Sequence, residues 1–202
     1  MSSAELNLHQ ARDKTNRKLL GLPGIDGIWI FITGDILVFS LMFLVYSYYR
    51  ALSPEVFHAS HLQLHKTFGL VNTILLLTSS WFVVTAVDCA RNRLTSMSKT
   101  LFVLAFCCGT GFIFSKYLEY SGEIAHGVTM MTNDFFMFYY VLTAIHCVHV
   151  LVGLAGLGFA ISRLYKPRYD SSDLAVFESA ATFWHMVDLL WIVLFPLLYL
   201  LP

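Results

Sequence analysis

Five long stretches of apolar residues constrain this chain more than any other feature of its sequence. A bilayer core of about 30 Å requires about 20 apolar residues in helical form, whereas β-strands seldom exceed about ten residues. The five stretches are therefore predicted to be helices that cross a membrane. They cover residues 28–49, 68–90, 101–120, 135–161 and 177–201.

The charge content supports this fold class. Only 13% of the 202 residues are charged, and the mean hydropathy is +0.66, whereas a soluble domain carries about 25% charged residues. We therefore predict an all-α integral membrane bundle of five transmembrane helices over residues 27–202, preceded by a polar segment, residues 1–26. This segment has no apolar core with a cleavage motif, so we expect no signal peptide. A net charge of zero gives no indication of a nucleic-acid partner.

The basic residues predict how the bundle is oriented. Of the 13 Lys and Arg residues, ten fall in the N-terminal segment and the second and fourth connections, which an odd number of spans places on one side. The positive-inside rule then puts the N-terminus in the cytoplasm and the C-terminus outside. The ten residues are Arg12, Lys14, Arg17, Lys18, Arg91, Arg93, Lys99, Arg163, Lys166 and Arg168. Tyrosines near the predicted span ends, among them Tyr46, Tyr117 and Tyr199, are expected to be interfacial anchors.

An acidic residue, Asp35, lies within the first span. A charged side chain at mid-membrane costs roughly 2.5–3.5 kcal/mol, which makes an intramembrane acid a candidate for function. Two interpretations remain open at this point. Asp35 either accepts a proton or contacts a lipid headgroup, or it is a hydrogen-bonded acid that fixes helix packing.

Histidines occur in the last two spans. His146 and His149 are three residues apart and share a helix face, as do His185 and Asp188. Imidazole ligands suit haem and copper, so one hypothesis is a metal site between the two helices. We favour interhelical hydrogen bonding, because His149 is expected at mid-span and His185 near the cytoplasmic start of its helix, which mismatches their depths.

Two further groups of polar residues lie nearer the outer side. His58, His61 and His65 are spaced as on one helix face between the first two spans, which suits either a transition-metal site or an exposed loop helix; we favour the loop helix. Glu119 follows Lys116 by three residues, so it either pairs with Lys116 on the helix surface or anchors a loop or lipid.

No nucleophile–base pair, phosphate loop or dinucleotide fingerprint is apparent, so no catalytic residue is predicted. The spans show no repeated pair of interrupted helices, which disfavours a secondary transporter. Two alternatives are nevertheless kept. One is a stand-alone haem- or copper-binding redox protein, and the other is a small transporter with Asp35 as its proton site.

Several strings of the sequence resemble the cytochrome c oxidase subunit III family. The resemblance covers residues 27–201, and its most specific part is FESAATFWHMVDLLW in the fifth span. GIWIFITGDILVFSLMF, VNTILLLTSS and KYLEY are similar to the family's earlier motifs. The matching residues of the last two spans are His146, His149, Val150, Gly153, Glu178, Trp184, His185, Val187, Asp188 and Trp191.

Departures from the family pattern point to one branch. Asp35 stands where the family has Glu, Cys147 replaces a Gly, and Thr182 replaces a Trp. Residues 85–88, Thr-Ala-Val-Asp, replace the family's Trp-Ala-His-His, and two N-terminal helices of the long form are not seen. This five-span pattern is similar to the short bacterial branch, including the NorE-like proteins associated with nitric oxide reductase.

The resemblance implies a non-catalytic accessory subunit of a haem-copper terminal oxidase or a nitric oxide reductase, multi-pass in the bacterial inner membrane. Such a subunit has no haem, copper or other cofactor of its own. Its family holds phospholipid in a V-shaped cleft and supports stability and proton uptake of the catalytic subunit. The partners would be that subunit and membrane lipids. Asp35, Glu119, His146, His149, His185 and Asp188 would then be buried polar links or lipid contacts.

Overall fold

Five long helices make up nearly all of the computed structural model, which describes residues 26–166 and 171–201. All five are long and apolar enough to cross a membrane, so the predicted fold class is confirmed. A short helix, α3 (Pro54–His61), joins the first two, and a π-helical segment, η1 (Pro196–Leu200), ends the last. The long helices are α2 (Asp26–Leu52), α4 (Lys66–Arg91), α5 (Thr95–Ala125), α6 (Asp134–Leu164) and α7 (Ser171–Phe195).

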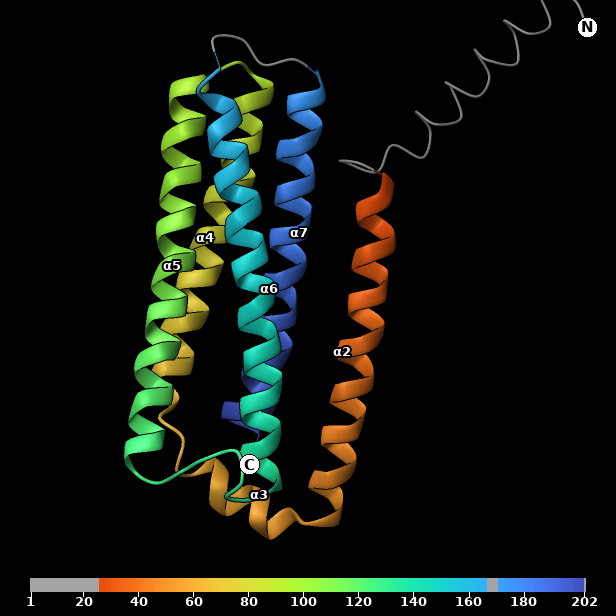
Figure 1. Ribbon diagram of the computed structural model, residues 1–202, viewed down its shortest axis with the longest axis vertical. Helices are drawn as coiled ribbons and strands as arrows, with labels where there is room; N and C mark the ends of the chain where they lie inside the picture. Colours follow the sequence, from red (N-terminus) through yellow and green to blue (C-terminus); the bar gives the residue numbers. More distant parts are fainter. Residues whose placement is uncertain (1–25, 167–170, 202) are drawn as a thin grey trace, which may run out of the picture.

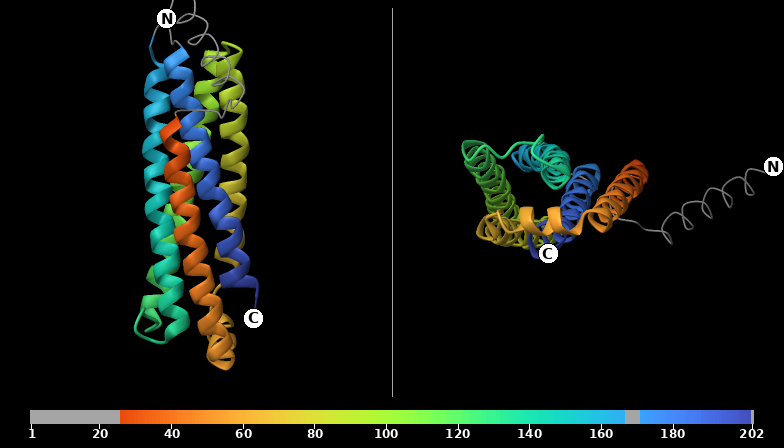
Figure 2. Two further views of the ribbon diagram at one scale, coloured as in Figure 1. Left: turned by 90° about the vertical axis from the view of Figure 1, so that its right-hand side faces the viewer. Right: turned by 90° about the horizontal axis from the view of Figure 1, so that it is seen from below.

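Four of these helices form an antiparallel bundle, and the fifth stands beside it. In Figure 1 and both views of Figure 2, α4, α5, α6 and α7 pack around one core, while α2 runs alongside α7 and α6 at the periphery. At the end of the bundle where α2 begins, α4 ends and α5 begins, and α6 ends and α7 begins. Of the basic residues used to predict the orientation, Arg12, Lys14, Arg17, Lys18 and Arg168 lie outside the described residues.

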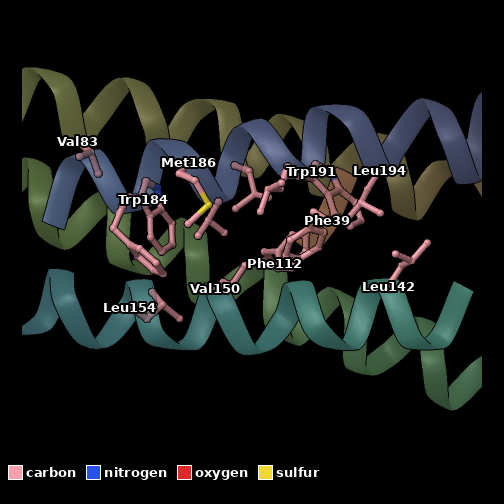
Figure 3. Close-up of a cluster of buried hydrophobic side chains, with 14 of the residues drawn as sticks. Phe39, Val83, Phe112, Leu142, Val150, Leu154, Trp184, Met186, Trp191 and Leu194 are labelled. Atoms are coloured by element: carbon pink, nitrogen blue, oxygen red, sulfur yellow. The ribbon is translucent and has the colours of Figure 1, made fainter. Parts of the chain in front are cut away.

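The bundle core is built from aromatic side chains and the glycines that make room for them. Figure 3 shows Phe112, Trp184 and Trp191 among the buried side chains between α5, α6 and α7. A Cβ atom added at Gly109 would lie 2.6 Å from the Trp184 ring, and one at Gly153 would lie 2.7 Å from it. Small residues allow such close approach between membrane helices, which explains why Gly153 and Trp184 occur together.

The short helix α3 is only partly the exposed loop helix that the sequence predicted. It crosses the end of the bundle opposite the start of α2 (Figure 2), and three of its own residues, Phe57, Ser60 and His61, are buried. The helix ends at His61, and His65 is the residue before α4. The three histidines at helical spacing therefore do not share one helix face.

Tyrosines near the span ends divide into two groups. Tyr48 and Tyr117 are exposed, as interfacial anchors are. Tyr46 and Tyr199 are buried instead, so the prediction that they are anchors is wrong. Both have a hydroxyl that finds a hydrogen-bond partner inside the protein, and that partner makes burial of a tyrosine possible.

Candidate functional site

A network of buried polar side chains surrounds Lys116 on α5. Its Nζ lies 2.8 Å from Oε2 of Glu119, one helical turn further on, and the two side chains are 2% and 0% exposed. Of the two sequence interpretations, a pair on the helix surface is wrong, because the pair points into the bundle. A buried ion pair is stable only when further hydrogen bonds compensate for the lost water.

Two tyrosines supply that compensation. Tyr199 in η1 accepts a hydrogen bond from Lys116 at 2.9 Å and donates one to Oε1 of Glu119 at 2.6 Å. The hydroxyl of Tyr139 on α6 lies 3.4 Å from Lys116 Nζ. Aromatic rings of Tyr120, Tyr139, Trp191 and Tyr199 lie 5.0–5.5 Å from the ammonium group, within the range of cation–π attraction.

The same cluster holds the C-terminal segment in place. Nε2 of His61 on α3 donates to the carbonyl oxygen of Tyr199 at 2.9 Å, and the hydroxyl of Tyr46 on α2 donates to the carbonyl of Leu197 at 3.1 Å. The last carbonyl groups of a helix have no partner within it, and these two side chains bond to carbonyls of the last residues of η1. Contacts from α2, α3, α5 and α6 therefore converge on η1.

His146 and His149, predicted to share one helix face, have different neighbours. The His146 ring is completely buried beside Trp191, with centroids 5.1 Å apart, and against Phe112 at 5.5 Å. Neither of its ring nitrogens has a hydrogen-bond partner within the described part of the chain. Instead of a hydrogen-bonded link between helices, His146 thus occupies an aromatic core position.

His149 faces α2. Its Nδ1 donates to the carbonyl of Ile145 at 2.8 Å, and its Nε2 lies 3.4 Å from Oδ2 of Asp35. The arrangement places a polar pair between α2 and α6, although Oδ2 of Asp35 makes no hydrogen bond within the described residues.

His185 and Asp188, on α7, face α4. Ser80 Oγ and His185 Nδ1 are 2.6 Å apart, and the same nitrogen lies 4.0 Å from Oδ2 of the buried Asp188. His185 lies near the middle of the combined α7 and η1, so it is not near the start of its helix. The depth mismatch predicted between His149 and His185 is therefore wrong; the two differ instead in the helix that they face.

Sequence-distant ion pairs fix the end of the bundle at which α2 begins. The guanidinium of Arg91 donates to one oxygen of Glu178 at 2.8 and 3.1 Å, which ties α4 to α7. Asp173 accepts from Arg163 at 3.1 Å and from Lys166 at 3.2 Å. Sequence reasoning used these basic residues only for orientation. The Glu178 of the family motif was the available signal for the first pair.

Two grooves border α2, where it separates from the bundle. One lies between α2 and α7, has a volume of about 640 Å³ and includes Ser40 and His185 in its lining. The other, of about 480 Å³, opens between α2, α6 and α7 near the start of α2 and is lined by apolar residues and Ser179. No group of three or more His, Cys, Asp or Glu side chains is placed to hold a metal within residues 26–166 and 171–201.

Comparison with known proteins identifies one family over most of the chain. The sequence profile described as cytochrome c oxidase subunit III matches residues 15–201. Cytochrome c oxidase subunit 3 of Synechocystis sp. is 31% identical over 176 residues, which cover 87% of this chain and 74% of the relative. The corresponding protein of a Bacillus species is 27% identical, with 95% and 92% covered. Subunit 3 of the Buchnera aphidicola cytochrome bo(3) ubiquinol oxidase is 26% identical, with 94% and 92% covered.

Proposed function

This chain belongs to the cytochrome c oxidase subunit III family, and on that premise we propose that it is a non-catalytic accessory subunit of a haem-copper respiratory complex. Its partner is the catalytic subunit of a terminal oxidase or of a nitric oxide reductase. Its own contribution is to the stability, lipid environment and proton uptake of that partner. The proton-uptake role is what resemblance to the family implies.

One observation carries the non-catalytic part of the proposal. Three polar residues of the family motifs contact groups of this chain: His185 bonds to Ser80, His149 lies beside Asp35, and Glu178 binds Arg91. Side chains engaged in this way position helices. We propose that the chain has no haem or copper of its own and that its redox chemistry lies in the neighbouring subunit.

The groove between α2, α6 and α7 supports a role in lipid binding. Its lining is apolar, and its one hydroxyl group, that of Ser179, already donates to the carbonyl of Ala175 at 2.8 Å. An acyl chain has no hydrogen-bonding group, so it suits a lining whose polar groups are satisfied. We propose that a phospholipid tail occupies this groove.

The proposed location is the bacterial inner membrane, with the N-terminus in the cytoplasm. Arg91, Arg93, Arg163 and Lys166 lie at or just beyond the ends of α4 and α6, which are at the same end of the bundle. This distribution supports the orientation that the positive-inside rule predicts.

Purification of the tagged full chain from its own membranes in mild detergent tests the proposal. The expected result is a stoichiometric haem-copper catalytic subunit in the complex, and its activity on oxygen or nitric oxide identifies the partner enzyme. The chain separated from this complex is expected to show no Soret absorption and no stoichiometric copper. A haem spectrum that stays with the isolated chain and disappears in His185→Ala would refute the proposal and indicate a stand-alone redox protein.

A further inference from the structure

The groove between α2 and α7 is open at the surface of the protein, where Ile36, Leu189 and Val193 of its lining are exposed. α2 touches the bundle through a narrow stripe of residues at seven-residue spacing, Ile32, Phe39 and Tyr46, and leaves space on either side of it. On the α7 wall of the groove, Leu189 is 63% exposed. Any occupant of this groove therefore lies within the hydrocarbon region and contacts both helices.

Two polar residues line this groove on opposite walls, His185 on α7 and Ser40 on α2. His185 uses Nδ1 for Ser80, while its Nε2 has no hydrogen-bond partner among the described residues, and its side chain is 31% exposed. Ser40 on α2 is exposed, and within the described ranges its hydroxyl also lacks a partner. The hydroxyl of Thr182, which also lines the groove, already donates to the carbonyl of Glu178 at 2.8 Å.

The chemistry of the lining distinguishes between occupants. A hydrogen-bonding group without a partner in hydrocarbon is costly, and an acyl chain supplies no donor or acceptor. A transmembrane helix with Ser, Thr, Asn or Gln at the right depth supplies both. The neighbouring α2–α6–α7 groove has no such requirement, because Ser179 is satisfied. The two grooves thus suit different occupants.

We propose that the α2–α7 groove is the docking site for a transmembrane helix of the partner subunit, which places a hydrogen-bonding side chain against His185 and Ser40 at mid-membrane. This inference rests on the proposed function, since it needs an assembled complex. It adds a specific surface, a specific depth and the chemistry of the residue on the partner.

Photo-crosslinking in the assembled complex tests the proposal. A benzophenone amino acid replaces Leu189 in the groove or, as a matched control, Phe114, an exposed residue of α5 equally far from the end of its helical segment. After irradiation in native membranes, the Leu189 position is expected to give an adduct with a transmembrane segment of another subunit. Peptide mapping should find Ser, Thr, Asn or Gln within one turn of the adduct. The control should give no adduct with that segment.

Variants of His185 show whether the hydrogen bond matters. In the Leu189 crosslinking background, His185→Leu is expected to lower the adduct yield by about three- to tenfold, the equivalent of one interhelical hydrogen bond. His185→Gln, which keeps a donor and an acceptor, should restore most of the yield.

Other outcomes overturn the inference. Three outcomes would refute docking of a partner helix in this groove while leaving the proposed function intact. They are adducts with lipid only, adducts with a second copy of this chain, and an adduct yield that His185→Leu leaves unchanged in a complex that still co-purifies. Failure of any partner to co-purify would refute the proposed function itself.

Discussion

The four helices of the α4–α7 bundle and α2 are all apolar enough to cross a membrane, yet they are held in different ways. In the bundle, glycines bring helices so close that a Cβ at Gly109 or Gly153 would collide with Trp184. On α2, Gly27 and Gly34 have nothing within 4 Å of an added Cβ. Because lipid is as apolar as leucine, helix association in membranes depends on close packing and polar contacts. α2 has little close packing against the bundle and relies on a few polar contacts.

This difference has a consequence for function. A tightly packed bundle provides a rigid body, whereas a helix joined by a narrow stripe leaves grooves that lipids or other helices fill. Changes in the bundle should therefore lower the stability of the isolated chain, and changes at α2 should mainly affect how α2 is attached.

Loss of the buried ammonium group should have the largest effect. Lys116→Met leaves the carboxylate of Glu119 buried without its counter-charge, which costs about 3–5 kcal/mol in the free energy of unfolding. Titration of the purified chain with a denaturing detergent, followed by loss of helicity, measures this cost. The exposed Lys66 provides a control, because Lys66→Met should change stability by no more than about 0.5 kcal/mol.

A second variant distinguishes charge from packing. In Lys116→Met with Glu119→Gln no charge is buried, and the Gln oxygen still accepts from Tyr199. We expect most of the lost stability to return. If the double variant is as unstable as the single one, the cation–π and packing contacts of Lys116 matter more than its charge.

Filling the space beside Trp184 should have the next largest effect. Gly153→Ala places a methyl group 2.7 Å from a ring that neighbouring helices enclose, and overpacking of this kind costs about 1–3 kcal/mol. Gly158→Ala on the same helix is the matched control, because its Cβ would lie 3.8 Å from Phe106, an ordinary contact. Thermal unfolding in detergent should separate the two; equal melting temperatures would contradict the close approach.

The link between α2 and the bundle should contribute the least. A double-mutant cycle with Asp35→Asn and His149→Gln is expected to give a coupling energy of about 0.6 kcal/mol, the average for polar pairs between membrane helices. Spin labels on α2 and α7 should also show a broader distance distribution in either single variant, while the unfolding of α4–α7 stays unchanged. A coupling energy near zero would mean that the stripe of Ile32, Phe39 and Tyr46 alone holds α2.

The sequence was informative wherever a local property decides the structure. Apolar runs long enough to span a bilayer predicted five helices, because in lipid a backbone satisfies its polar groups by forming a helix. Motif resemblance identified the family that the profile and relatives also indicate. Residues such as Asp35 and His185 were singled out because polar side chains are costly in hydrocarbon.

The partners of those residues depend on rotation and depth, which residue spacing along one helix does not determine. Lys116 and Glu119 are three residues apart on either a wet or a buried face, and only the packing of α5 against α6 and η1 turns them inward. His146 and His149 share the same spacing, yet one packs against Trp191 and the other faces Asp35. The sequence alone thus determined that the chain crosses a membrane in five helices, through local hydrophobicity. The tertiary structure decided which polar groups meet and which face an open groove, because those contacts join residues distant in the chain.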